Sequence, residues 1–295
     1  MLGFKLRREK ETAQPKPVLD LSGPRLRRAF EHLTASTEST GGIERYVGAL
    51  ALKASLFQEI LGKGKVEEMS AAEFLDLAAF ITPGRRRMTS SLGDDNTDRL
   101  RAAIVELLAG WSDVSHADTR LNAFMATFPQ DKSHRWVRDL GAEILHFSAP
   151  DHYPLMTRWM WDARVGTGVL REIWHADRMD MSAIDIADDY ATFAVLYEEL
   201  GGFLADNGVF RDHVFYTDLL CAHVYAGYIN DQGGQYLRSD FTEEIDPLVH
   251  TRRMLGLDAI DTETGRTRLK LIDGKAHTLG SDTQLLGGGR QHADS

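Results

Sequence analysis

The sequence is poor in cysteine, in long apolar runs and in complete catalytic motifs, and each absence excludes a class of protein. A single cysteine, Cys221, allows neither a disulfide framework nor a thiolate metal cage. The best apolar run, 47–52, is far shorter than the roughly 20 residues that span a bilayer. The basic N-terminus has no apolar segment behind it, so we expect no secretory signal and a cytoplasmic protein.

Complete motifs for common enzyme chemistry are also missing. We find no Gly-x-Ser-x-Gly elbow, no phosphate-binding P-loop and no His-Glu-x-x-His zinc motif. Cys221 and His223 lie two residues apart and would point to different sides of a helix, which argues against a nucleophile pair. The pattern assigns no general acid and base, and whether the chain is an enzyme stays open.

Negative charge dominates the chain but not its beginning. The first 30 residues carry eight Lys or Arg against three Asp or Glu, and the remainder carries 26 against 41, for a net charge of −10. An acidic body argues against broad binding of nucleic acid, because contact with phosphates requires a basic surface. We interpret residues 1–20 as a basic flexible arm.

The apolar periodicity predicts an all-α protein with a small C-terminal β-hairpin and flexible termini. Helical spacing and capping motifs predict helices from Pro24 and over 43–61, 70–80, 98–111, 117–127, 132–147, 152–163, 182–204 and 211–229, the last ended by Gly233-Gly234. Strands over 257–261 and 267–272 would form the hairpin around Gly265. The predicted organisation is an arm (1–20), a helical domain (21–256), a hairpin appendage (257–275) and a flexible tail (276–295).

A Glu-x-x-His motif occurs twice in residues 134–175. On a helix this spacing places a carboxylate and an imidazole on one face, as in the carboxylate-bridged metal centres of helical bundles. Glu143, His146, Glu172 and His175 would then hold iron or manganese. The interval between the two motifs is short and contains Pro150 and Pro154, so this metal site is an alternative hypothesis and not our first prediction.

Residues 134–175 also hold four of the five tryptophans. Trp159 and Trp161 are two residues apart and cannot share one helix face, so we expect one in the core and one toward a groove. Trp and Arg dominate the energetics of protein interfaces. Our first prediction is therefore an accessory or regulatory protein that binds a protein partner through Trp159, Trp161, Trp174, Arg158 and Arg171.

Two observations keep a nucleic-acid alternative open. The run Arg85, Arg86 and Arg87 follows a Pro-Gly turn and would suit an anion such as phosphate. Residues 132–162 comprise a helix ending in Leu-His-Phe, a proline loop and a segment with Asp162; this layout resembles that of some helix-hairpin-helix DNA glycosylases. The resemblance implies a nucleic-acid-associated helical protein, but the glycine-rich hairpin of that family is not found.

Overall fold

A computed structural model describes residues 16–62, 64–82, 85, 97–175, 184–236, 247–259, 270–272 and 275–277, and these are predominantly helical. The α-helices are α1 (Gly23–Glu38), α2 (Ile43–Leu61), α3 (Ala71–Ala79), α5 (Thr97–Leu108), α6 (Ala117–Ala126), α7 (Trp136–Ser148), α8 (Val169–Glu172), α9 (Tyr190–Asp206), α10 (His213–Tyr236) and α11 (Pro247–Met254). Short 3-10 helices are η1 (Lys65–Glu68), η3 (Val114–His116), η4 (Lys132–His134) and η5 (Leu257–Ala259).

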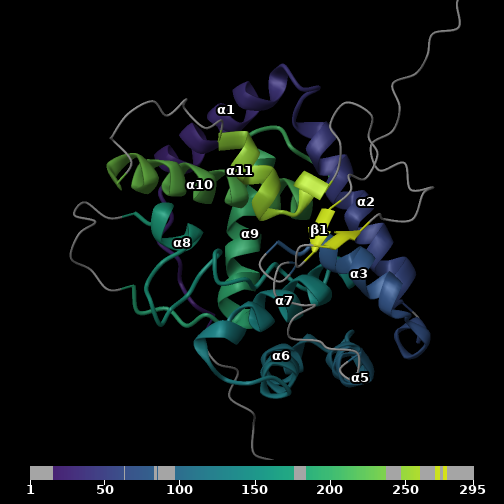
Figure 1. Cartoon of the computed structure of the whole chain (residues 1–295). Coiled ribbons are helices and arrows are strands. Elements are labelled where there is room, and N and C mark those ends of the chain that lie inside the picture. The colour runs from purple at the N-terminus through teal and green to yellow at the C-terminus, as the bar shows by residue number, and fades with distance from the viewer. Residues whose placement is uncertain are drawn as a thin grey trace, which may run out of the picture.

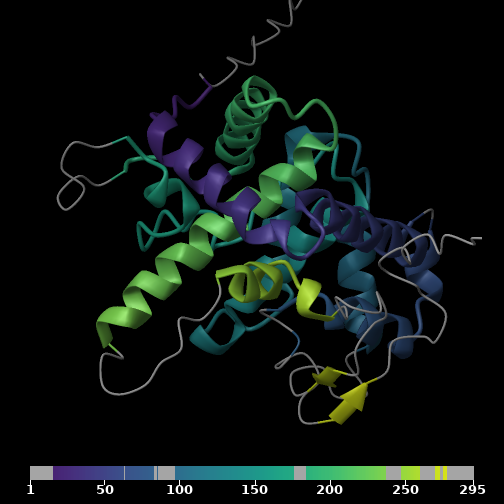
Figure 2. The ribbon, with the colours of Figure 1, turned by 90° about the horizontal axis from the view of Figure 1, so that it is seen from above.

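Two helices form the centres of the packing. Helix α10 contacts α1, α2, α8, α9 and α11, and α7 contacts α2, α5 and α6. Figure 1 shows α9 running between these groups, with α1, α10 and α11 at one end and α5, α6 and α7 at the other. Viewed from above, α1 crosses α10, and the C-terminal end of α10 projects past the neighbouring helices (Figure 2). One continuous apolar core joins the two groups.

The helices with the strongest local signals lie where the sequence predicts them. Helix α2 spans the predicted residues 43–61 and ends at Gly62, whose N–H bonds the Gln58 carbonyl. Helix α3 begins with the predicted capping box: Ser70 Oγ accepts from the Glu73 N–H at 3.2 Å, and the Glu73 carboxylate accepts from the Ser70 N–H at 2.8 Å. Each bond satisfies a donor that the helix itself leaves unpaired.

The helix predicted over 152–163 is wrong. Between α7 and α8 the chain forms an irregular buried loop, and both of its tryptophans are inside: Trp159 is 6% exposed and Trp161 0%. The Trp161 indole donates to the Ile186 carbonyl at 3.0 Å. Gly168 closes the loop at φ +129°, where an added Cβ would lie 2.7 Å from the Met160 carbonyl oxygen.

Other boundaries also differ. Helix α9 begins at Tyr190, after the Asp189 cap, and α10 continues through Gly233-Gly234 to Tyr236. Within the first predicted strand of the hairpin, Leu257–Ala259 form η5, and residues 260 and 261 lie outside the described residues. Strand β1 (Lys270–Ile272), which falls within the second predicted strand, pairs antiparallel with β2 (Lys275–His277). Residues 1–15 of the predicted arm and 278–295 of the predicted tail lie outside the described residues.

The end of the predicted arm pairs with the segment around α8. Leu21 and Trp174 form an antiparallel bridge, and the Asp20 carbonyl accepts from the His175 N–H at 2.7 Å. The Arg25 side chain donates to the Glu172 carbonyl at 3.0 Å. The start of α1 is thereby fixed to α8, although more than 140 residues separate them in the chain.

Candidate functional site

The first Glu-x-x-His motif lies on the buried face of α7, and its carboxylate is paired with a lysine. Lys53 on α2 is fully buried and directs its ammonium at three acceptors: Glu143 Oε2 at 2.7 Å, the Leu255 carbonyl at 2.9 Å and the Phe80 carbonyl at 3.1 Å. All three protons of the ammonium are therefore used. The Phe147 ring lies 3.9 Å from the same nitrogen and adds a cation–π contact.

Burial opposes charge on both members of this pair. It lowers the pKa of Lys53, while the neighbouring Glu143 carboxylate raises it. It raises the pKa of Glu143, against the opposite effect of Lys53. A glycine allows the approach of the chain segments around the ammonium: at Gly256 (φ +71°) a Cβ would lie 1.8 Å from the Phe80 carbonyl oxygen, one of the Lys53 acceptors.

The histidine of the motif belongs to a second buried network. His146 Nδ1 donates to the Tyr153 carbonyl at 2.7 Å, because a carbonyl can only accept. Its Nε2 lies 2.9 Å from Asp218 Oδ2, and Asp218 Oδ1 accepts from the Tyr197 hydroxyl. Because Nδ1 carries a proton, a hydrogen bond between Nε2 and Asp218 needs a second proton, held either by Nε2 or by the carboxyl group. In both arrangements the charges of His146 and Asp218 sum to zero.

The second motif is not brought together with the first. Glu172 ends α8, where burial raises the pKa of its carboxyl and the guanidinium groups of Arg25 and Arg171 lower it. His175 is exposed. The described residues contain no group of three or more His, Cys, Asp or Glu side chains that could hold a metal ion, so Glu143, His146, Glu172 and His175 do not form one ligand set there.

Because the side chains of both networks are buried, we interpret them as structural. Lys53, His146 and Asp218 have no exposed side-chain surface, and Glu143 has almost none. No solute reaches these groups while the core is packed. Burial also raises the pKa of the Cys221 thiol and of Tyr197 well above their ordinary ranges, which keeps both groups neutral at pH 7.

The predicted partner-binding residues separate into a buried and a surface set. Trp159 and Trp161 are both in the core, so the prediction that one of them faces a groove is wrong. Arg158 keeps 27% of its side chain exposed while its guanidinium bonds the buried Asp139 carboxylate at 2.6 and 3.1 Å. Trp174 and Arg171 are half-buried on α8 and directly after it.

Two tyrosines that the sequence analysis did not single out extend this surface along α10. The Tyr225 ring centroid lies 6.0 Å from that of Trp159 and 5.8 Å from that of Tyr228. The Trp159 Nε1 atom is buried and has no hydrogen-bond partner among the described residues. We define the surface formed by Arg158, Arg171, Tyr225 and Tyr228 as the α8–α10 face; α8 and α10 are in contact, and Tyr225 lies within electrostatic range of Arg158 and Glu172.

Fixed charges surround the α8–α10 face. The Glu172 carboxylate lies within electrostatic range of Arg171, Asp231 and Tyr225. Burial raises the pKa of Tyr225, so its hydroxyl is a neutral donor at pH 7. The face therefore combines aromatic area, arginine and hydroxyl donors.

In the anion site predicted at Arg85, Arg86 and Arg87, Arg85 is not open to solvent. Arg85 is buried, and its guanidinium makes two hydrogen bonds with Asp258 at 2.7 and 2.8 Å. This ion pair joins the end of the α3 region to η5 and leaves that guanidinium unable to meet an anion from solution. Arg86 and Arg87 lie outside the described residues.

No helix among the described residues is long and apolar enough to cross a membrane. Comparison of the chain with known protein families, characterised proteins and solved structures gives no match.

Proposed function

We propose that this chain is an accessory protein that binds a protein partner through the α8–α10 face. The observation that carries the proposal is the contact between the partly exposed rings of Tyr225 and Tyr228, which pack on the buried Trp159, with Arg158 within electrostatic range of Tyr225. Tyr, Trp and Arg provide most of the binding energy in protein interfaces, because each buries a large area and offers a polar group.

The shape of the region supports the same proposal. The C-terminal turns of α10 project beyond the neighbouring helices in both views (Figures 1 and 2). Gly227 lies between the two tyrosines, and an added Cβ there would meet nothing within 4 Å. A partner can therefore approach this stretch of α10 without displacing another element.

Preorganisation supports it further. The Asp139 carboxylate holds Arg158 through two nitrogens of its guanidinium, so little side-chain entropy remains to be lost on binding. The Tyr225 hydroxyl and the partly exposed Arg158 guanidinium can each donate a hydrogen bond. We therefore expect the partner to supply carbonyl or carboxylate oxygens at this surface.

Quantitative co-purification from the native cells tests the proposal. We expect one protein to be recovered at a fixed ratio to the wild-type chain. Tyr228→Ala and Arg171→Glu should reduce its affinity by about 30-fold, because interface hot spots contribute 2 kcal/mol or more. Phe210→Ala is the matched control: Phe210 is 80% exposed and precedes the opposite end of α10.

Two results would overturn the proposal. Recovery of the free chain alone would remove the partner. Equal recovery with wild type, Tyr228→Ala and Phe210→Ala would show that a partner exists and binds elsewhere. Urea denaturation of each variant separates loss of binding from loss of folding.

The metal and nucleic-acid alternatives gain no supporting observation from the described residues. Glu143 bonds Lys53, His146 bonds Asp218, and Arg85 is paired with Asp258, all within the chain. Elemental analysis after metal-replete expression tests the first alternative, and binding to DNA at low salt tests the second.

A further inference from the structure

A cavity lies on another side of the molecule, where three helices end. Its volume is about 600 Å³, within the range of pockets that hold small molecules. It is lined by Gln58, Leu61, Gly62, Gly64, Lys65, Val66, Glu67, Val105, Leu108, Ala109, Trp111, Ser148 and Ala149. None of these residues belongs to the α8–α10 face, so the cavity is a separate feature.

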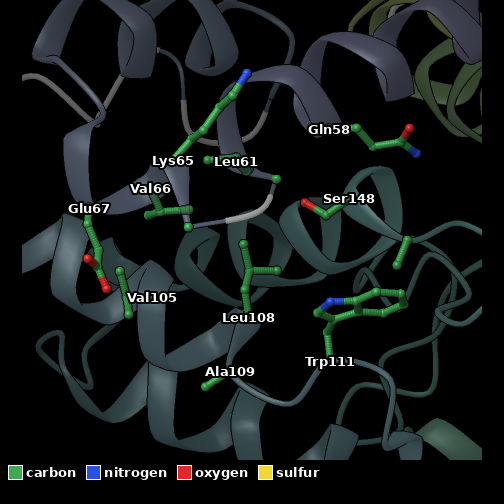
Figure 3. A pocket seen from close by; sticks show the side chains of 13 residues that line it. Gln58, Leu61, Lys65, Val66, Glu67, Val105, Leu108, Ala109, Trp111 and Ser148 are labelled. Carbon is green, nitrogen blue, oxygen red and sulfur yellow. The ribbon is translucent and has the colours of Figure 1, made fainter.

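The interior of the cavity is apolar, with few polar groups. Leu61, Val66 and Leu108 surround its centre in Figure 3, and Trp111 forms one wall with 45% of its surface exposed. The Ser148 hydroxyl is directed toward the cavity, while the Lys65 side chain leads away from it (Figure 3). Ser148 Oγ is buried and has no hydrogen-bond partner among the described residues.

The C-terminal ends of three helices meet at the cavity. Helix α2 ends at Leu61, α5 at Leu108 and α7 at Ser148, and all three residues line the cavity. The C-terminus of a helix carries the equivalent of about −0.5 charge, from carbonyl groups without intrahelical partners. An end of this kind favours a cation or a hydrogen-bond donor and opposes an anion, unless a cation of the chain already meets it.

Cations of the chain already occupy two of these three ends. Lys65 Nζ donates to the Glu59 carbonyl of α2 at 3.0 Å, and Arg120 donates to the Gly110 carbonyl after α5 at 2.9 Å. At the α7 end, the polar atom without a partner is Ser148 Oγ. The Trp111 ring, which also lines the cavity, can bind a cation on its face.

We infer that this cavity binds a small organic ammonium compound, an amine with an apolar body. The apolar body would fill the space between Leu61, Val66 and Leu108. The ammonium would donate to Ser148 Oγ and to the carbonyl groups at the end of α7, with the Trp111 ring beside it. The net charge of −10 also attracts such a cation to the protein.

Calorimetric titration of the full chain at pH 7 with three probes of equal length tests the inference. The probes are 4-phenylbutylamine, 4-phenylbutanol and 4-phenylbutanoate, which share a phenyl group on a four-carbon chain and carry a positive, a neutral and a negative head group. We expect the amine to bind at least about ten-fold more tightly than the alcohol, and the carboxylate to bind most weakly. Equal affinities of amine and alcohol, preference for the carboxylate, or no heat of binding for the amine would each overturn the inference.

Variants locate the binding. Ala109→Trp adds an indole at the exposed rim and should abolish amine binding by filling the opening. Trp111→Leu should weaken it about five-fold through loss of the cation–π contact. Tyr228→Ala, on the α8–α10 face, is the control and should leave it unchanged. Amine binding that survives Ala109→Trp would place the ligand elsewhere and contradict the inference.

Discussion

The two buried networks around Lys53 and His146 differ from the polar groups near the proposed binding sites in how fully they are bonded. In the core, Lys53 has three acceptors, and Asp218 bonds both His146 and Tyr197. Among the described residues, the indole N–H of Trp159, buried behind Tyr225, has no partner, and neither does the Ser148 hydroxyl at the cavity. Lys53, His146 and Asp218 are of the types that often serve in catalysis, but their hydrogen-bonding groups are already taken up by other groups of the chain.

This contrast separates stability from binding. A buried charge that loses its partner costs several kcal/mol, so groups of this kind are held by complete networks. A buried donor without a partner costs about 1–3 kcal/mol and is tolerated where a ligand or partner completes it. Four of the six unpartnered atoms among the described residues belong to Trp136, Ser148, Thr157 and Trp159, and Thr157 and Trp159 flank Arg158 of the α8–α10 face.

The largest effect is expected in the core. Lys53→Met leaves the Glu143 carboxylate buried without its partner and should lower the free energy of unfolding by about 3–5 kcal/mol. Urea denaturation followed by circular dichroism measures this. The double variant Lys53→Met/Glu143→Leu removes both charges and should be more stable than the single variant. A double variant less stable than the single one would contradict the account of the pair.

The second network should give a smaller effect that depends on hydrogen bonding. Asp218→Ala leaves His146 Nε2 and the Tyr197 hydroxyl without partners and should cost about 2–4 kcal/mol. Asp218→Asn keeps an acceptor for Tyr197 and a donor for a neutral His146, so it should cost clearly less. Equal losses for the two variants would show that charge, and not hydrogen bonding, holds this network.

The surface sites should contribute little to stability. Tyr228→Ala and Ser148→Ala are each expected to change the free energy of unfolding by no more than about 1 kcal/mol, because neither side chain completes a buried network. The same denaturation experiment compares them with the core variants. A loss of unfolding free energy as large as that of Lys53→Met in either variant would contradict the distinction between the buried networks and the binding surfaces.

The smallest effect concerns an exposed cap and appears only in acid. The hydroxyl and backbone N–H of Ser133 and the ring of His134 lower the pKa of Asp131 to about 2. A carboxyl with a lowered pKa stabilises the folded state above its unfolded pKa of about 4, and this contribution is lost as the pH falls toward 2. Asp131→Asn should therefore show a shallower decline of melting temperature between pH 4 and pH 2 than wild type.

Local signals in the sequence predicted some elements well and others not at all. The apolar stripe and the glycine stop of α2 and the capping box of α3 act within a few residues, and the structure confirms both. The 152–163 segment has helical spacing, but Pro154 and the insertion of two tryptophans into the core hold it as a loop. Tertiary packing determines the conformation of residues 152–163, and the apolar spacing within that segment carries no information about such packing.

The candidate sites show the same limit. Lys53 lies in the apolar stripe of the predicted helix 43–61, so its burial could have been recognised from the sequence. Its pairing with Glu143, 90 residues away, could not. Helix α10 continues past the predicted stop at Gly233-Gly234, because glycine is only mildly unfavourable inside a helix. The cavity requires three helix ends that only the folded chain brings together.

Hydrogen–deuterium exchange on the chain with and without its co-purified partner tests the central claim most directly. We expect the partner to slow exchange in residues 171–174 and 225–231, at the α8–α10 face, and to leave residues 139–147 of the already protected α7 core unchanged. Protection confined to other surfaces, with no change at 225–231, would contradict the claim that this protein binds its partner through the α8–α10 face.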